Sequence, residues 1–115
     1  MPVLLKRAYE APAPSDGCRV LVDRFWPRGV KKDKAGIDLW LKDVAPSPAL
    51  CRWFGHDPAK WEEFRQRYGA ELEVNPALQE LRSLLRHGTV TLVFGARDLQ
   101  HNHALVLEEA LAKGD

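Results

Sequence analysis

The polar residues best suited to chemistry lie in the string CRVLVDRFWPRGVKK, residues 18 to 32. An apolar run is followed directly by Asp23, Arg24, Trp26 and Arg28, with a proline and a glycine among them. A turn needs residues such as Gly, Pro, Asn or Asp, but not two arginines and a tryptophan. Guanidinium groups offer planar, bidentate donors to phosphate or carboxylate, so Arg24 and Arg28 are predicted to clamp an anion. Trp26 would form a wall of this site, and Asp23 would orient an arginine or act as a base.

A second group of polar residues follows the apolar string TVTLVFGA and contains Asp98, His101 and His103. His103 shares the three-and-four spacing of Val106 and Leu107, which predicts that it faces inward from a helix. The positive end of a helix disfavours the imidazolium ion, so a neutral His103 is expected and is the candidate for proton transfer. His101 lies on a flank more open to water. The alternatives are a core His103 bonded to one backbone group and a solvated His101.

A metal site is the competing interpretation of this second group. Asp98, His101, His103 and His56 are ligand types that suit zinc or iron. If Asp98 caps a helix that begins at Leu99, however, the two rings of His-x-His point about 200° apart. The sequence therefore predicts no shared metal ion, and purified protein without stoichiometric zinc or iron. A site at Asp98, His101 and His103 remains the alternative.

Two further residues could reach the same cleft. His56 follows the string RWFG and could enter a cleft or simply end a helix. Arg65 lies on one helical face with Trp61, Phe64 and Tyr68, so its head group could be drawn towards the edge of a sheet. The alternative for Arg65 is a surface arginine whose stem covers apolar area. Both are candidate ligand-binding residues.

Length and composition limit the possible classes of protein. The chain of 115 residues predicts one domain, residues 1–115, without room for a second core. A net charge of +1 does not favour nucleic-acid binding. No apolar run is long enough to span a membrane, and the N-terminus does not resemble a signal peptide, so a cytoplasmic location is expected. Two cysteines without a CxxC motif indicate buried, inert thiols.

The elements that must position these residues can be inferred from periodicity. Strands are predicted at PVLLKRAY, CRVLVDR and TVTLVFGA, and helices at the following strings: GIDLWLKDVAP, SPALCRWFG, the segment from Asp57-Pro58, the segment from Asn75-Pro76 to Gly88, and RDLQHNHALVLEEALAKG. This order predicts an α/β fold with a small, mostly parallel sheet of about three strands and four or five helices. Ligands bind outside the carboxyl ends of such strands. The two polar groups should therefore converge, with Arg24 or Arg28 within about 10 Å of His103. His103 and Trp61 should be mostly buried, and Lys32 and Lys34 exposed.

The sequence resembles the YeaO-like branch of the domain-of-unknown-function family 488. The resemblance runs from about residue 6 to residue 111 and rests on VDRFWPRG, on WFGHDP and on DLQHNH. Because the family name states no activity, the function still has to be inferred from the residues.

Longer relatives in this family carry a C-x-E…C-H-R motif after the last strand. The resemblance places Phe94 and Asn102 at its cysteine positions, Ala96 at its glutamate and Ala104 at its arginine. Only the histidine, His103, is retained. The residues that thiol or thiolate–metal chemistry would need are therefore replaced at these positions.

Three hypotheses follow. The leading one is a pocket for an anionic small molecule at the strand ends, which could be the site of an enzyme. The second is a module that binds RNA or protein through the basic and aromatic DRFWPRGVKK loop. The third is a buried ion-pair network of Asp23, Arg24 and Arg28 that only ties the loop down. No cofactor or oligomeric state is indicated.

Overall fold

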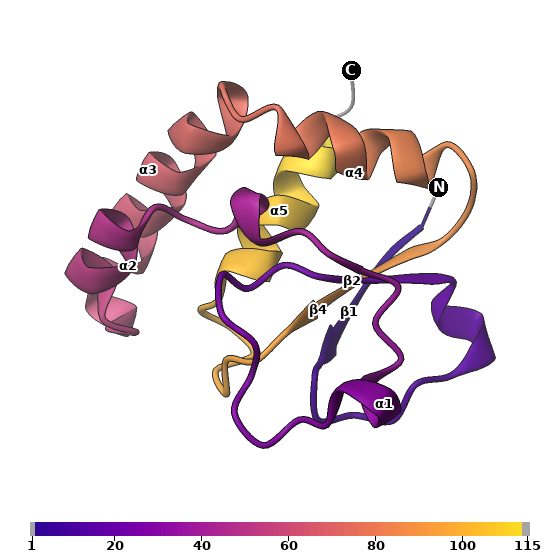
Figure 1. The fold of residues 1–115 in the computed structure, drawn as a ribbon. Coiled ribbons are helices and arrows are strands. Elements are labelled where there is room, and N and C mark those ends of the chain that lie inside the picture. Colours follow the sequence, from indigo (N-terminus) through magenta and orange to yellow (C-terminus); the bar gives the residue numbers. More distant parts are fainter. Residues whose placement is uncertain (1, 114–115) are drawn as a thin grey trace.

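The strands form a four-stranded, fully parallel sheet (Figure 1) in the computed structural model, which describes residues 2–113. The sheet order is β1-β4-β2-β3, with β1 at Val3–Arg7, β2 at Cys18–Leu21, β3 at Leu39–Trp40 and β4 at Val90–Phe94. The predicted α/β class is confirmed, with one strand more than expected. The carboxyl ends of β2 and β4 consequently lie next to each other at one edge of the sheet.

Within residues 2–113, five α-helices accompany the sheet: α1 (Lys32–Ala35), α2 (Pro48–Phe54), α3 (Trp61–Glu73), α4 (Ala77–Leu85) and α5 (His103–Ala112). Short 3-10 helices lie at Pro14–Asp16, Lys42–Val44 and Pro58–Lys60. The Ser47 side chain accepts a hydrogen bond from the Leu50 N–H, and Asn75 does the same for Ala77. These two predicted helix starts are therefore confirmed. None of the helices within residues 2–113 has the length and hydropathy needed to cross a bilayer.

The segment GIDLWLKDVAP does not form the helix that was predicted for it. Leu39 and Trp40 form β3, which pairs with β2, and the 3-10 turn Lys42–Val44 follows. The pairing is fixed by Asp38, whose carboxylate accepts from Arg19 N at 2.8 Å and whose N–H donates to Arg19 O at 2.8 Å. These contacts join residues nineteen positions apart. Hydrogen bonding to the distant strand β2 therefore overrode the local preference for a helix that the spacing of the apolar residues had indicated.

The last helix begins at His103, not at the expected Leu99. Asn102 is its cap and accepts from the Leu105 N–H at 3.2 Å. Asp98 instead closes a turn by accepting from the N–H groups of Gln100 and His101. An Asp or Asn side chain can stabilise a turn as well as a helix start, which is why the sequence pattern was ambiguous.

The two faces of the sheet are covered differently. One face packs against α2 to α5 through the main core, which includes Val20, Leu92 and Tyr68. On the other face Leu21 and Val93 lie under a smaller cluster whose members come from β3 and from the chain between β2 and β3: Trp26, Val30, Ile37 and Trp40. The loop that carries the candidate site is therefore held against the sheet by its own apolar residues.

A buried ion pair anchors this second face. Asp16 and Arg19 are 1% and 3% exposed, and a guanidinium nitrogen lies 2.7 Å from the carboxylate. The other guanidinium nitrogens donate to Gly36 O at 3.2 Å and Ala35 O at 2.9 Å. Lys6 completes the group at 2.9 Å from Asp16. The arrangement ties the end of α1 to β2.

We expect acid to weaken the fold through Asp16. The hydrogen bond from Lys6, with those from Ala13 N–H and Arg19, lowers the pKa of Asp16 from 3.8 to about 2. Because the folded state binds this proton less readily than the unfolded chain, the contribution of Asp16 is complete above pH 3.8 and is lost as the pH falls towards 2. NMR titration of the Asp16 carboxyl carbon should give a midpoint near 2. A midpoint close to the ordinary value would contradict the expectation.

Candidate functional site

A pocket of about 590 Å³ lies at the carboxyl ends of β2 and β4. The loop after β2 contributes most of its charged and aromatic lining, the segment after β4 adds Gly95, Ala96 and His103, and α2 with its end adds Cys51, Arg52 and His56. The pocket therefore brings together Arg24, Trp26, Arg28, His56, His103 and Asp23 from the predicted site residues.

Asp23 and His103 are in direct contact. His103 Nε2 lies 3.0 Å from Val22 O and 3.2 Å from Asp23 Oδ1, while Asp23 Oδ2 accepts from Gly95 N–H at 2.9 Å. The His103 ring also packs edge-to-face on Tyr68, with ring centres 6.2 Å apart. With its side chain 15% exposed, His103 is mostly buried, as predicted.

The positive charges of Arg24 and Arg28 are not neutralised by ion pairs with acidic side chains in the described residues. Arg24 donates to the carbonyl oxygens of Ala45 and Pro46, and its Nε is buried with no hydrogen-bond partner in the described residues. Within residues 2–113 neither Arg24 nor Arg28 forms an ion pair with a carboxylate. The third hypothesis, an ion-pair network with Asp23, is therefore not what the structure shows. With Arg52, three arginines and one aspartate line the pocket.

The walls of the pocket are mainly apolar. Phe25, which is 78% exposed, lies at the edge of the pocket. Three prolines also line the pocket: Pro27, Pro46 and Pro48. Trp26 is fixed by a hydrogen bond from Nε1 to Val30 O at 2.7 Å and by an edge-to-face contact with Trp40. Trp26 therefore supports the loop as well as lining the pocket.

A smaller cavity of about 60 Å³ adjoins the pocket and shares Pro46, Cys51, His56, Ala96 and His103 with it. It is completed by Phe54, Phe64, His101 and Asn102. We call it the inner chamber. His101 therefore reaches the site through this chamber, from the irregular segment before α5.

Asp98 lies behind His101 and lines neither the pocket nor the inner chamber. Its Oδ2 lies 2.9 Å from His101 Nδ1. The hydrogen bond from the Gln100 N–H lowers the pKa of Asp98, and the hydrogen bond with the His101 side chain lowers it further. The Asp98 carboxylate is therefore ionised. Because the chain from Asp98 to Asn102 is not helical, the angle argument against a shared metal ion does not apply. In the described part of the chain, however, no three His, Cys, Asp or Glu residues are placed to hold one.

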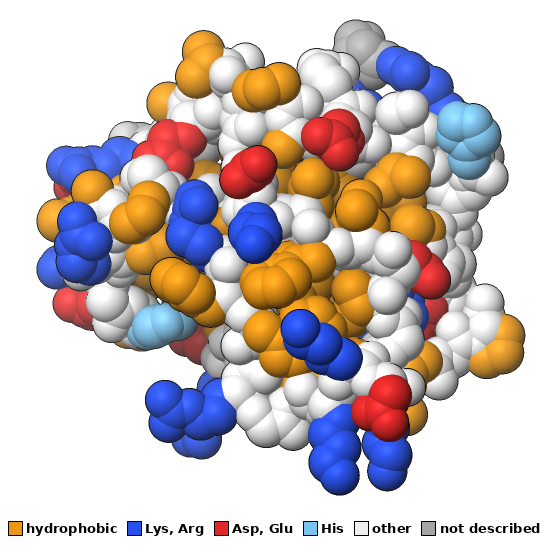
Figure 2. All heavy atoms as spheres, in the orientation of Figure 1, with side chains coloured by type: hydrophobic (Ala, Val, Ile, Leu, Met, Phe, Trp, Pro, Cys, Tyr) orange, Lys and Arg blue, Asp and Glu red, His pale blue; other side chains and the backbone are white. Residues whose placement is uncertain are grey.

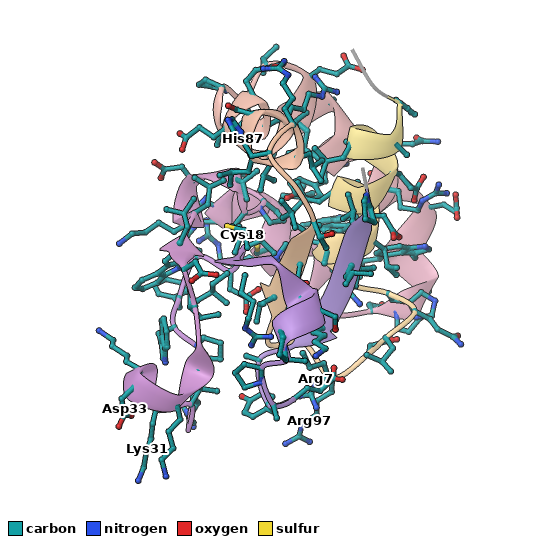
Figure 3. The ribbon with its side chains drawn as sticks, turned by 90° about the vertical axis from the view of Figure 1, so that its right-hand side faces the viewer. Arg7, Cys18, Lys31, Asp33, His87 and Arg97 are labelled. Atoms are coloured by element: carbon teal, nitrogen blue, oxygen red, sulfur yellow. The ribbon has the colours of Figure 1, made fainter. Side chains whose placement is uncertain are left out.

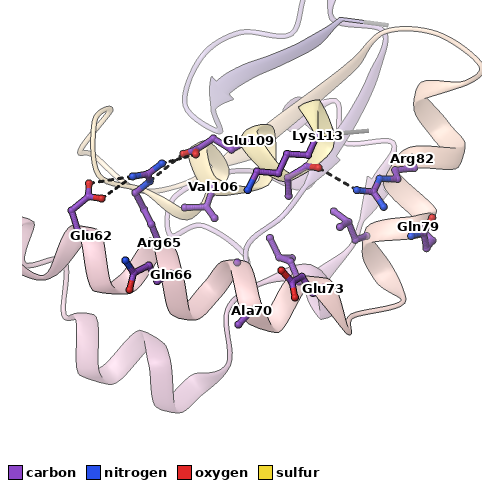
Figure 4. A pocket seen from close by; sticks show the side chains of 14 residues that line it. Glu62, Arg65, Gln66, Ala70, Glu73, Gln79, Arg82, Val106, Glu109 and Lys113 are labelled. Carbon is purple, nitrogen blue, oxygen red and sulfur yellow. Dashed lines mark hydrogen bonds and ion pairs between the residues drawn. The ribbon is translucent and has the colours of Figure 1, made fainter. Parts of the chain in front are cut away.

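Arg65 lies elsewhere. It pairs with Glu62 at 2.8 Å and with Glu109 at 2.6 Å, beside a groove of about 510 Å³ between α3, α4 and α5 (Figure 4). Carboxylates on its own helix and on α5 hold the guanidinium there, away from the strand ends. Arg65 therefore cannot join the Arg24 and Arg28 side chains around one small ligand in this structure.

Several lining residues were not proposed from the sequence as part of the site, among them Tyr9, Cys51 and Arg52. Arg52 lies four residues before His56, and the left-handed backbone of Gly55 and His56 folds the chain back at the end of α2. That Gly-His step after a helix was the available signal. The cysteines were interpreted as buried, inert thiols, but Cys51 is exposed and Cys18 is half-buried. Partial desolvation nevertheless raises the pKa of the Cys51 thiol, and its Sγ lies 3.7 Å from Pro46 O, so this thiol lines the pocket in its protonated form.

The basic loop does not form a flat aromatic platform. Trp26 is half-buried, and Lys31 and Asp33 project from the α1 segment away from the sheet (Figure 3). Lys32 and Lys34 are exposed, as predicted. On the face shown in Figure 2, basic side chains are interspersed with acidic and apolar ones. The loop therefore contributes its charged and aromatic side chains to a pocket and does not form a continuous basic surface on that face.

The comparisons with known proteins agree with the resemblance seen in the sequence. Residues 2–114 match the family described as DUF488-N3i, the inactive DUF488-N3 subclade. Uncharacterized proteins of Mycobacterium tuberculosis (strain H37Rv) and Mycobacterium bovis are each 46% identical over 109 residues, which cover 95% of this chain and 92% of theirs. The uncharacterized protein YeaO of Escherichia coli (strain K12) is 38% identical over 112 residues, covering 96% and 97%. No solved structure matches. The chain therefore belongs to the DUF488 family, in its YeaO-like branch.

Proposed function

We propose that this protein binds a small anionic molecule with an apolar body in the strand-end pocket. The observation that carries the proposal is the lining of that pocket. Arg24, Arg28 and Arg52 surround about 590 Å³ of concave space, and neither Arg24 nor Arg28 has a carboxylate partner within residues 2–113. Arginine suits carboxylate and phosphate groups, while prolines and Phe25 suit a hydrocarbon or aromatic body.

Binding without catalysis is the form of this proposal that the residues favour. The matching subclade is described as inactive. Cys51 is the thiol in the pocket, and its raised pKa keeps it protonated and weakly nucleophilic. His103 Nε2 is engaged with Val22 O instead of activating a neighbouring nucleophile. Asp23 and His103 would thus shape and polarise the pocket.

The alternative of an RNA-binding module receives less support. Such modules offer exposed aromatic rings on which bases stack. The indole of Trp26 is instead packed against Trp40 and bonded to Val30 O. Phe25 is the exposed ring of this loop, and it lies at the edge of the pocket.

The test is the melting temperature in the presence of benzoate, phosphate or sulfate, at ionic strength matched with chloride. A ligand at ten times its Kd stabilises the folded state by about 1.4 kcal/mol. For a domain of this size the melting temperature should then rise by about 5 °C. We expect Arg28→Ala, at an exposed position, to abolish the rise and leave the unliganded melting temperature nearly unchanged.

Arg97→Ala is the matched control. Arg97 is an exposed arginine near the same edge of the sheet, but it does not line the pocket (Figure 3). The control variant should respond to the anions as the unmodified protein does. Equal loss of the response in both variants would reduce the effect to general surface charge, and a full response in Arg28→Ala would place the anion elsewhere.

A further inference from the structure

Two of the histidines that line the inner chamber, His101 and His103, each have one ring nitrogen within hydrogen-bond distance of an acceptor outside the chamber lining. His103 Nε2 lies 3.0 Å from Val22 O, and a carbonyl oxygen can only accept a hydrogen bond. The neighbouring Asp23 Oδ1, at 3.2 Å, is also an acceptor. Nε2 must therefore carry the hydrogen, and in the neutral ring Nδ1 bears a lone pair. No residue of the described chain donates a hydrogen bond to this Nδ1.

His101 is fixed in the opposite tautomer. Its Nδ1 lies 2.9 Å from the ionised carboxylate of Asp98, so in the neutral ring the hydrogen is on Nδ1 and the lone pair is on Nε2. The ring is also oriented by an edge-to-face contact with Trp61, with centres 5.5 Å apart. Asp98 is thus a positioning residue, because it selects which nitrogen of His101 is left free.

The remaining polar side chains of the chamber leave few donors available. The Asn102 amide donates to Asp98 O at 2.8 Å, and its oxygen accepts from Leu105 N–H. The Cys51 thiol is near Pro46 O. Apart from His56 on its exposed side, the polar side-chain groups that the described lining residues leave to a ligand are these two imidazole lone pairs, beside Phe54 and Phe64.

We propose that the inner chamber is a subsite for an amino group, so that the ligand is a small anion that also carries an amine. This inference rests on the proposed function, since the arginines of the outer pocket would hold the anionic end. A volume of about 60 Å³ suits a group of this size, because a water molecule occupies about 30 Å³ in the liquid. An N–H donor would satisfy the imidazole lone pairs, whereas a second anion would be repelled by them.

The first measurement is the tautomeric state of both rings by long-range ¹H–¹⁵N NMR on the intact protein at pH 8. We expect the Nε2–H form for His103 and the Nδ1–H form for His101. The second is calorimetric binding of two matched pairs, benzoate with 4-aminobenzoate and hexanoate with 6-aminohexanoate. At least one amine should bind about tenfold more tightly than its partner, which corresponds to one good hydrogen bond.

Asp98→Asn tests the role of Asp98 without removing any lining residue. The amide oxygen can keep the turn to Gln100 N–H, but the amide nitrogen would donate to His101 Nδ1 and move the ring hydrogen to Nε2. The preference for the amine should then disappear while benzoate still binds. Asp57→Asn is the control, because Asp57 caps Ala59 N–H in the same way without a histidine partner.

The outcomes are distinguishable. If no member of either pair binds, the proposed function fails and this inference fails with it. If both members of each pair bind equally, or if Asp98→Asn keeps the preference, the inference alone is overturned. Added zinc that binds stoichiometrically and shifts the His101 Nε2 and His103 Nδ1 resonances would assign the chamber to a metal ion and also overturn it.

Discussion

Replacing Arg19 with methionine is expected to lower the free energy of unfolding by about 3 kcal/mol, the usual cost of leaving one partner of a buried ion pair behind. The Arg19 side chain joins Asp16, Ala35 O and Gly36 O in a region where it is 3% exposed. Methionine can replace the apolar stem but none of the donors. Ala35 O, in a buried residue at the end of α1, would then lose its side-chain partner, as would Gly36 O. Urea unfolding of both proteins measures the difference.

The control for this prediction is a surface ion pair. Arg67 pairs with Glu63 across one turn of α3, with both side chains about half exposed. Arg67→Met should change the unfolding free energy by less than about 1 kcal/mol. Equal losses in the two variants would mean that the burial of Arg19 does not set its contribution.

Gly17→Ala is expected to be more damaging still, with a loss of about 4 kcal/mol or no folding at all. Gly17 has φ of +63°, a conformation that side chains rarely adopt, at the entry to β2. A Cβ at this position would lie 2.3 Å from the backbone oxygen of Thr89. That oxygen accepts the Cys18 N–H at 3.0 Å, so relieving the clash would pull β2 away from the chain that enters β4.

Gly29→Ala separates backbone strain from this clash. Gly29 has φ of +83°, but a Cβ there would meet nothing within 4 Å. The loss should be only the conformational cost of about 1 to 2 kcal/mol. Thermal unfolding of the two variants gives the comparison. Similar melting temperatures for both would refute the close approach at Gly17.

These stability predictions are independent of the ligand predictions. Asp16, Gly17 and Arg19 do not line the strand-end pocket or the inner chamber. A weakened but folded Arg19→Met protein should therefore still bind benzoate near its original affinity. Asp16, Gly17 and Arg19 thus lie apart from the residues that would hold a ligand.

Local sequence was sufficient where the deciding contacts are local. Caps such as Ser47 and Asn75 bond to N–H groups two or three residues away, so their helices could be predicted. The continuous apolar runs around Val20 and Leu92 identified two buried parallel strands. The spacing of His103 with Val106 and Leu107 correctly predicted an inward-facing ring near the strand ends. Those inferences were enough to locate the pocket.

Only the tertiary structure decided features that depend on distant partners. Leu39 and Trp40 became a strand because Asp38 pairs with Arg19, and Arg65 stays at the α3–α5 groove because Glu109 is there. The choice between Asp98 and Asn102 as the cap of α5 could not be read from two equally suitable side chains. The contacts from which the tautomers of the two histidines are inferred, with Val22 O and Asp98, likewise exist only in the folded chain. Sequence periodicity reports which face a residue occupies, but a hydrogen-bond partner or an ion pair across the fold is fixed only when the elements pack together.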